Sequence, residues 1–459
     1  MFQTEIKKEF GAEPVASSEM DTAILTWIEV YAGRPAWVDP VNDIRTINFA
    51  KAVCEEAARL TVMAVGINVS GSARADYLQG VVDRAMYRNH RLRHWAEYGC
   101  GYGTVIFKPN GSGIDVITPD RFMITECDSN KQITGIVFAD TYRDGDNVYT
   151  KHEYHRFRER TEDNGETVRV YMISNKAYVS RSEQAIGKEI PLTMTKWADL
   201  QPETAISNVQ DGHMLFGAFV MPGANNIDTD SSMGMSLFAN ALHEMRDLDI
   251  AYSRNAWEID NSNVIELLGD AMIPSEAGTD RLPSHVHNVM SLPESDFYQQ
   301  IDRPIKTDQR KIGINMLLSQ AGFKCGFSDG YFVFDSKSGT ITTATQVESD
   351  DRRTIQLIKD IRDSLQTAID DTLYAASVFA DLYDLAPVGD YQIDYDWGDI
   401  TYNYDEDRAR TYQLVKDGNL PLWMYLVKFE GFSEEEAKQL QQIKEDKEKS
   451  NLQLFASEE

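Results

Sequence analysis

The segment 343–385 constrains the fold of this chain more than any other stretch, because it contains neither glycine nor proline. One face of it can be traced at steps of three and four residues, the spacing of an α-helix, through Val347, Thr354, Ile358, Ile361, Leu365, Ala368, Thr372, Ala376 and Tyr383. The segment predicts a helix about 60 Å long, which Pro387 and Gly389 end. The other elements have to be arranged around this helix.

Two further helices are predicted before this segment. The first occupies 234–262, where side chains recur at helical spacing over roughly 40 Å, at Leu237, Ala241, Met245, Leu248, Tyr252, Ala256 and Ile259. The second is expected to be capped by Thr307 and to end at Ala321. Gly322 follows it and suits the left-handed conformation that closes many helices.

An insertion at 263–306 separates these two helices. Short strands are expected at 264–268 and 296–301, and the insertion is punctuated by Pro274, Pro283, Pro293 and Pro304. This pattern predicts a small α/β module. A loop is then expected at 323–342, between the second helix and the long one.

The N-terminal part combines helices with an antiparallel β region. Helices are predicted at 21–31, 48–62, 74–88 and 90–98, with a strand at 63–69. Strands are predicted at 104–108, 113–117, 133–140, 148–157 and 168–174, separated by turn signals such as Asn110-Gly111 and Asp144-Gly145. A strand at 391–396 and helices at 406–417 and 433–447 close the chain. The predicted fold class is α+β, in two or three domains.

The chain is strongly acidic, with a formal net charge of −28 over 459 residues. Tight binding of nucleic acid uses basic side chains to neutralise phosphates, so the charge argues against a repressor or a nucleosome-like binder. The same charge is compatible with DNA that passes a surface without adhering to it, and equally with an acidic enzyme.

Neither a membrane segment nor a disulfide framework is expected. The longest apolar stretches are shorter than the ~18 residues that cross a bilayer, and the N-terminus lacks a signal-peptide core, so the chain is expected to stay in the cytoplasm where it is made. The four cysteines, Cys54, Cys100, Cys127 and Cys325, show no CxxC spacing and are expected to be buried free thiols.

Glycine and histidine patterns invite two catalytic interpretations. Gly99, Gly101 and Gly103 suggest a phosphate loop, but here a helix leads into the glycines and a strand leaves them, the reverse of such a loop. His152 and His155 are three residues apart in a predicted strand, so they are expected to point to opposite faces and not to share a metal. Neither pattern predicts a cofactor or metal site.

Paired aspartates supply the main alternative to a non-catalytic protein. Asp247 with Asp249, Asp350 with Asp351, Asp370 with Asp371, and Asp394 with Asp396 could provide the carboxylates of a two-metal phosphodiesterase. Such pairs also arise easily in a chain with 73 acidic residues, as parts of solvated helix faces. A metal-dependent nuclease therefore stays open as the alternative function.

Three strings in a fixed order resemble a signature of the portal proteins of tailed bacteriophages, a GF…GxFxFD stretch followed by TATEV. The residues that carry it are Gly322 and Phe323, then Gly330, Phe332, Phe334 and Asp335, then Thr343, Ala344, Thr345 and Val347. Gln346 stands where the family usually has Glu. Gly234–Ala241, Trp27–Trp37 and Gly103–Lys108 are also similar to the family, so the resemblance spans nearly the whole chain.

The resemblance implies a portal fold with named parts. It implies an N-terminal region and wing at 1–233, a stem helix at 234–262, a clip at 263–306 and a second stem helix at 307–322. A tunnel loop at 323–342, a long wing helix at 343–385, a returning wing strand at 386–405 and a C-terminal crown at 406–459 would follow.

The resemblance also implies a function without catalysis and without cofactors. Portal proteins form rings, usually dodecamers, at one capsid vertex of the virion, after assembly in the host cytoplasm. Double-stranded DNA passes through the ring during genome packaging and ejection. The implied partners are the large terminase, the head-completion and connector proteins, and the major capsid and scaffolding proteins.

The tunnel loop is the candidate site. Lys324 and Lys337 could meet phosphates one at a time, and Ser328, Ser336, Ser338, Thr340 and Thr342 could donate hydrogen bonds to them. Gly326, Gly330 and Gly339 would let the loop flex. The alternative is an ordinary connection between two helices, although a loop of this length usually has a function.

Overall fold

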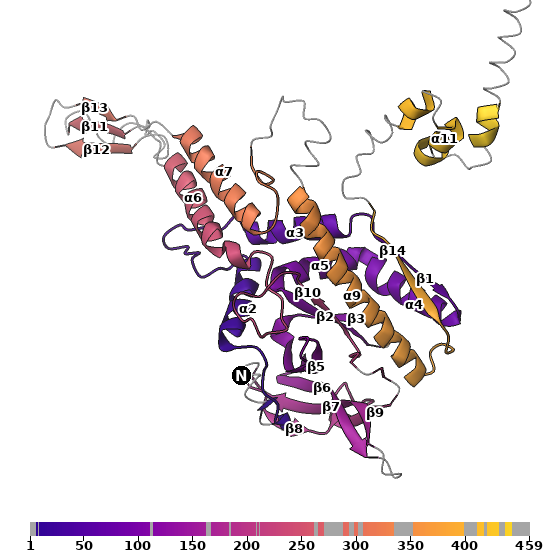
Figure 1. Cartoon of the computed structure of the whole chain (residues 1–459). Helices are drawn as coiled ribbons and strands as arrows, with labels where there is room; N and C mark the ends of the chain where they lie inside the picture. Colours follow the sequence, from indigo (N-terminus) through magenta and orange to yellow (C-terminus); the bar gives the residue numbers. More distant parts are fainter. Residues whose placement is uncertain are drawn as a thin grey trace, which may run out of the picture. The chain divides into compact units, whose positions relative to one another are not determined.

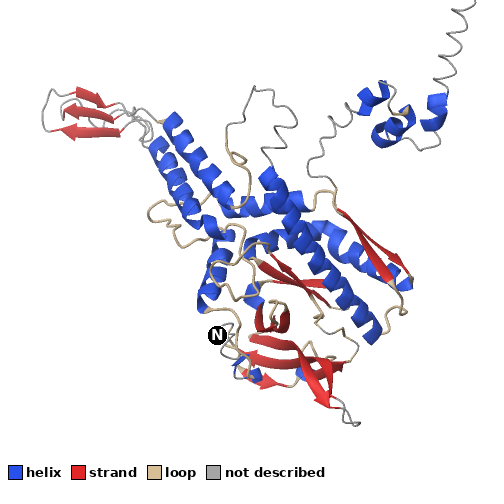
Figure 2. Cartoon of the chain, viewed as in Figure 1, coloured by secondary structure: helices blue, strands red, loops and turns tan. Residues whose placement is uncertain are grey.

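The computed structural model of the chain consists of two compact units, Met1–Trp397 and Gly398–Glu459. Figure 1 shows the elements in sequence colours, and Figure 2 shows that helices and strands both contribute extensively, which agrees with the predicted α+β class. The structure describes residues 6–7, 9–110, 113–161, 167–182, 185–207, 209–210, 212–260, 265–269, 288–292, 298–301, 306–334, 352–398, 411–416, 420–430 and 437–442.

The first unit is built along the long helix α9 (Arg352–Leu382), whose 31 residues extend about 46 Å. Its buried face has the predicted spacing, with Ile358, Ile361, Leu365, Ala368, Thr372 and Ala376 all covered. This face packs on β2 (Thr104–Pro109), β10 (Gly217–Val220), α3 (Phe49–Thr61) and α4 (Ala73–Val82). The predicted helix is thus confirmed from 352 to 382, while its first part, 343–351, lies outside the described residues.

Arg74 holds the C-terminal end of α9 against α4. This side chain is only 1% exposed, and its Nε donates to the Pro387 carbonyl over 2.9 Å. The guanidinium also donates to the carbonyls of Ser377 (2.6 Å) and Ala386 (2.8 Å) and pairs with the Asp381 carboxylate. One side chain therefore ties the last turns of α9 to the chain that follows the helix.

Two antiparallel helices, α6 (Leu242–Asp260) and α7 (Thr307–Lys324), form a hairpin (Figure 1). Arg310 pairs with Glu258 at 2.5 Å, and Lys324 pairs with Glu244 at 2.6 Å. These two ion pairs lie about four turns apart along both helices. They therefore fix the register of the hairpin near both of its ends.

The predicted limits of α7 were wrong at both ends. Thr307 is the first helical residue rather than the cap, because Lys306 occupies the N-cap position and makes no side-chain capping bond. The helix continues through Gly322 to Lys324. A side chain at Gly322 would place its Cβ 2.9 Å from the Phe332 ring, so this glycine permits close packing, and Gly326, with a φ of 91°, takes the left-handed position instead.

The insertion between α6 and α7 contains a three-stranded sheet. Its central strand β11 (Ile265–Gly269) pairs in parallel with β12 (Asn288–Leu292) and antiparallel with β13 (Tyr298–Ile301). The two expected strands are confirmed to within two residues, whereas β12 was not identified. The described residues of 263–306 show strands and no helix.

The largest sheet has the strand order β4-β5-β6-β7-β8, with β9 also paired to β7. Its strands are β4 (Phe122–Cys127), β5 (Ile133–Asp144), β6 (Asn147–Thr161), β7 (Thr167–Ser180), β8 (Lys188–Ile190) and β9 (Glu203–Ile206). Every pairing in it is antiparallel, as predicted. Gly145, with a φ of 59°, turns the chain between β5 and β6 where the Asp144-Gly145 signal predicted a hairpin.

Two smaller antiparallel sheets complete the β structure. One has the order β10-β2-β3, in which β3 is Ile114–Ile117, and the other joins β1 (Gly66–Gly71) to β14 (Tyr391–Asp396). The second pairing brings the strand that follows α9 back to the N-terminal region. Strand β14 has the bounds that the sequence predicted.

The N-terminal helices α2 (Ser18–Tyr31), α3, α4 and α5 (Arg91–Tyr102) lie close to the predicted positions. Helix α5 runs on through the glycine cluster, however, and ends beside Gly103, whose φ is 79°. A Cβ on Gly99 would lie 2.1 Å from the Phe219 ring, and one on Gly101 would lie 2.9 Å from Tyr31. The cluster therefore serves close helix packing.

The second unit is small and helical where it is described. It contains α11 (Leu422–Glu430) and helical residues at 411–416 and 437–442. Tyr412 and Tyr425 are in ring contact at 5.4 Å, and the amide of Trp423 donates to Gln441 at 3.0 Å. The two predicted C-terminal helices are described only at 411–416 and 437–442, and α11 was not predicted.

All four cysteines are free thiols, as expected, although Cys127 is only partly buried. Burial raises the pKa of the Cys100 thiol to about 12, so this thiol is protonated at neutral pH. None of the described helices is both long enough and apolar enough to cross a membrane.

Candidate functional site

Of the residues predicted to face DNA, the structure describes Lys324 and Ser328. The other members of the predicted set lie outside the described residues: Ser336, Lys337, Ser338, Thr340 and Thr342. Asp335, Thr343, Ala344, Thr345 and Val347 of the signature lie outside them as well. The described part of the site is therefore the segment 325–334, which follows α7, together with Lys324 itself.

Lys324 lies in the last turn of α7 and donates from Nζ to Glu244 Oε1 on α6. Burial alone would raise the pKa of Glu244, but the hydrogen bond from Lys324 lowers it below the ordinary value. The glutamate is therefore ionised at neutral pH and balances the lysine. Asp329 lines the same groove, so the groove as a whole has little attraction for phosphate.

Ser328, which was expected to line the tunnel, lies inside the single chain. The side chain is buried, and its hydroxyl lies 3.0 Å from Thr354 Oγ1 in the first turn of α9. The Ser328 amide also donates to Thr354 Oγ1 over 2.9 Å. Because these groups satisfy one another away from solvent, Ser328 anchors the start of the segment to α9.

An aromatic cluster holds the same segment against α3. Phe327 is fully buried and packs with Tyr331 and Phe332, at ring distances of 5.1 and 4.9 Å. Phe332 meets Phe49 of α3 edge-on at 5.1 Å, and Tyr331 donates a 2.5 Å hydrogen bond to Glu56 on the same helix. The segment 325–334 is thus tied to α3 as well as to α9.

The described signature residues have identifiable packing roles. Gly322 makes room for Phe332, and Gly330 adopts a φ of 75° that glycine tolerates best. Phe323 is half exposed and lies under the Arg353 guanidinium at 3.7 Å. Phe334 is largely exposed, and its amide donates to Asn315 of α7. The signature therefore specifies how α7, the segment and α9 are joined.

Exposed apolar side chains gather on the α6–α7 hairpin. On α6, Met245 and Leu248 are buried as predicted, but the same stripe continues to Tyr252 and Ile259, which are 41% and 50% exposed. On α7 and just beyond it the exposed apolar residues are Ile312, Met316, Phe323 and Phe334. The apolar spacing of α6 therefore extends beyond the residues that this chain buries, which was not predicted from the sequence.

Three of the paired aspartates lie against polar side chains of other elements. Asp249 accepts from the Trp37 indole at 2.8 Å, and Asp370 accepts from the Tyr395 hydroxyl at 2.7 Å. Asp371 lies 3.6 Å from the His213 ring. Burial raises the pKa of all three carboxyls above the ordinary value. No group of three or more His, Cys, Asp or Glu side chains converges within the described ranges.

The two strand histidines lie on opposite faces of β6, as predicted. His152 Nδ1 is 2.7 Å from Glu9, a residue of the N-terminal segment. His155 lies between Tyr171, which donates from its hydroxyl to Nδ1 at 2.8 Å, and Glu153, which is 2.7 Å from Nε2. Both rings are therefore parts of buried hydrogen-bond networks.

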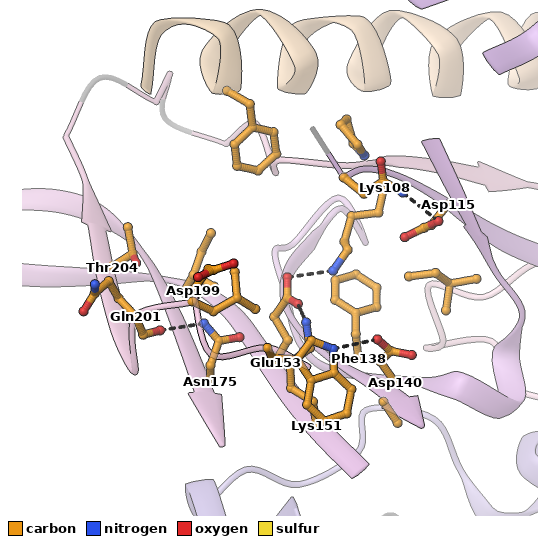
Figure 3. A pocket seen from close by; sticks show the side chains of 18 of the residues that line it. Lys108, Asp115, Phe138, Asp140, Lys151, Glu153, Asn175, Asp199, Gln201 and Thr204 are labelled. Carbon is orange, nitrogen blue, oxygen red and sulfur yellow. Dashed lines mark hydrogen bonds and ion pairs between the residues drawn. The ribbon is translucent and has the colours of Figure 1, made fainter. Parts of the chain in front are cut away.

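A large cavity lies beside the main sheet (Figure 3). Its volume is about 1190 Å³, and its walls come from β2, β3, β5, β6, β7, the segment 196–204 and the end of α9. Lys108 and Lys151 point to the Glu153 carboxylate inside it, as the dashed lines in Figure 3 show. Nothing in the local sequence signalled this cavity, because its walls come from distant parts of the chain.

No protein-family model matches the chain, and no curated protein matches it. Among solved structures, the chain is similar to one in the virion of a native gene transfer agent particle, with 10% identity and a TM-score of 0.38, over 86% of this chain and 89% of the other. It is also similar to a chain in the neck of an empty gene transfer agent particle, with 12% identity and a TM-score of 0.37, over 91% and 93%. Function is accordingly argued from the residues of this chain.

Proposed function

We propose that the chain is a portal-type subunit, that several copies form a ring at one capsid vertex, and that double-stranded DNA passes through this ring. The observation that carries the proposal is the exposed apolar stripe on the α6–α7 hairpin. A stripe of this kind on an ordered helix pair favours an interface, because leaving it in water forgoes the free energy of burial.

The order of elements supports the same function. A helix, a small inserted sheet, a second helix, an anchored segment and a long helix follow one another as the sequence resemblance implies. In this proposal the hairpin is the stem, the insertion is the clip that the terminase and connector proteins contact, and the segment 335–342 is the part of the tunnel loop that faces the DNA. Capsid and scaffolding proteins would surround the ring in the virion, and twelve copies is the number that the resemblance favours.

We further propose that the subunit has no catalytic site, so that the energy for DNA movement comes from a separate terminase. The structural hydrogen bonds of Asp249 and Asp370 support this view over a two-metal nuclease. Lys324 should contact DNA only weakly, because the carboxylate of Glu244 neutralises its positive charge within the same chain. DNA could then slide instead of being captured.

A charged substitution on the stripe tests the proposal. Ile312 is 69% exposed and Met316 is 60% exposed, so Ile312→Asp with Met316→Asp should not disturb the fold of a single chain but should prevent ring formation. Met194→Asp is the matched control, because Met194 is 70% exposed beside the main sheet.

Light scattering coupled to size exclusion would measure the mass of each variant. We expect rings for the unmodified chain and for the control, and single chains for the double variant. If the double variant formed rings as well as the unmodified chain does, the assignment of the hairpin as the stem would be refuted. Magnesium-dependent DNA cleavage by the unmodified chain would favour a nuclease instead.

A further inference from the structure

The lining of the cavity in Figure 3 holds four basic and four acidic side chains, but its buried part holds two lysines and only one carboxylate. Lys108 and Lys151 donate to the same Glu153 carboxylate at 2.7 and 2.6 Å, with side-chain exposures of only 13% and 8%. Burial alone would raise the pKa of Glu153, but Lys108, His155 and Lys151 hold it well below the ordinary value. Two lysines therefore share one ionised carboxylate.

His155 does not change the net charge of these three side chains. Burial lowers the pKa of His155 below its ordinary value, so the ring is neutral at pH 7. A neutral ring that accepts from Tyr171 at Nδ1 donates from Nε2 to Glu153. The buried group formed by Lys108, Lys151, Glu153 and His155 thus has a net charge of about +1 at neutral pH.

The other charged side chains of the lining add no further positive charge. Arg121 and Lys196 are each 3.6 Å from Asp140, which also accepts from the Trp197 indole at 3.1 Å. The two other carboxylates of the lining belong to Asp115 and Asp199, which are exposed. Arg121 and Lys196 are about half exposed as well, so water screens all of these groups more strongly than it screens the buried lysines. The interior therefore favours an anion, although the chain as a whole has a charge of −28.

The cavity also has an unfilled acceptor. Asn175 is 7% exposed, and its amide nitrogen donates to the Gln201 carbonyl at 2.9 Å. Its side-chain oxygen is buried and accepts no hydrogen bond from the described residues. Buried acceptors are normally satisfied, and the N–H of a peptide would satisfy this one.

The remaining wall is apolar and comes from the end of α9. Phe379, Leu382, Tyr383 and Leu385 line it, and the last three are substantially exposed in the single chain. A ligand that fits both walls needs a carboxylate for the lysines and a large apolar side chain for α9.

We propose that this cavity binds a short acidic peptide segment of a partner protein, with a carboxylate on Lys108 and Lys151 and an apolar side chain against the end of α9. An acidic peptide can supply a carboxylate to the lysines, an N–H donor to the Asn175 oxygen and an apolar side chain to the end of α9. The inference does not depend on ring formation, because every wall belongs to one chain.

The test uses the full chain and two labelled pentapeptides, acetyl-Leu-Asp-Phe-Asp-Leu-amide and its uncharged counterpart acetyl-Leu-Asn-Phe-Asn-Leu-amide. Fluorescence polarisation should show saturable binding of the acidic peptide and at least about tenfold weaker binding of the uncharged one. Lys151→Met should weaken binding of the acidic peptide by a similar factor. Its fold should persist, because Lys108 still neutralises Glu153, and Lys108→Met provides an independent second variant.

Lys188→Met is the matched control, because Lys188 is exposed on β8 of the same sheet and outside the cavity lining. Equal binding of the two peptides, unchanged binding by both cavity variants, or no saturable binding would overturn the proposal. Self-association of the chain that the acidic peptide competes away and that Lys151→Met abolishes would identify a second copy as the occupant instead. Equally tight binding of hydrocinnamate would indicate a small carboxylate and would also contradict a peptide site.

Discussion

Replacement of Arg74 by lysine should weaken the end of α9 more than any other conservative change in the first unit. Arg74 donates to the carbonyls of Ser377, Ala386 and Pro387 at 2.6 to 2.9 Å, and it is 1% exposed. A lysine keeps the charge but cannot reach three carbonyls from one planar group. Hydrogen bonds to a charged donor contribute about 1.5–3 kcal/mol each, so losing two of them should cost about 3–5 kcal/mol after relaxation.

Urea denaturation followed by circular dichroism would measure this cost. Hydrogen exchange in peptides covering 377–388 would locate it, because the freed carbonyls lie there. Arg34→Lys is the control, because Arg34 forms an exposed ion pair with Glu29 and should leave the midpoint unchanged. If the Arg74→Lys chain unfolded at the same urea concentration as this control, with unchanged exchange at 377–388, Arg74 would not stabilise the end of α9.

Three other changes test the packing and the buried charges. Gly217→Ala would place a Cβ 1.9 Å from a carbonyl oxygen of α9 and should lower the free energy of unfolding, measured by urea denaturation, by about 3 kcal/mol. Gly113→Ala is the control and should lower it much less, because no atom lies closer than 3.9 Å to the added Cβ. A double-mutant cycle of Ser328→Ala and Thr354→Val should give a coupling energy of about 1 kcal/mol in the same assay, and a value near zero would show that the pair does not anchor the segment. Because the folded-state pKa of Glu153 is depressed, its stabilising contribution is complete above its unfolded pKa of about 4.3 and is lost as pH falls through the folded value. Acid titration should therefore show a shallower fall in the free energy of unfolding for Glu153→Gln than for the unmodified chain, and parallel curves would contradict this.

The regular elements of the first unit could largely be predicted from the sequence, because their signals are local. Helix α9 has helical spacing without glycine or proline, and β14 was predicted to the residue. The limits of α7 could not be found in this way. Gly322 looked like a helix end, but its role is set by the Phe332 ring that packs against it.

The missed functional features depend on contacts between distant parts of the chain. Lys108 and Glu153 come from different sheets and meet only after folding. Ser328 looked like a polar residue of a flexible loop, yet its partner Thr354 is on α9 and buries it. Sequence spacing shows which face of an element is apolar, but it does not show which neighbour covers that face.

Single-particle cryo-electron microscopy of the purified chain would show whether it assembles into rings through the α6–α7 hairpin. We expect closed rings in which the α6–α7 hairpins of adjacent copies pack together. Ile312 and Met316 should be buried between the hairpins, and the segment 335–342 should be directed at the central channel. Single chains or dimers at every salt concentration, or rings in which these two side chains face solvent on the outer rim, would contradict it.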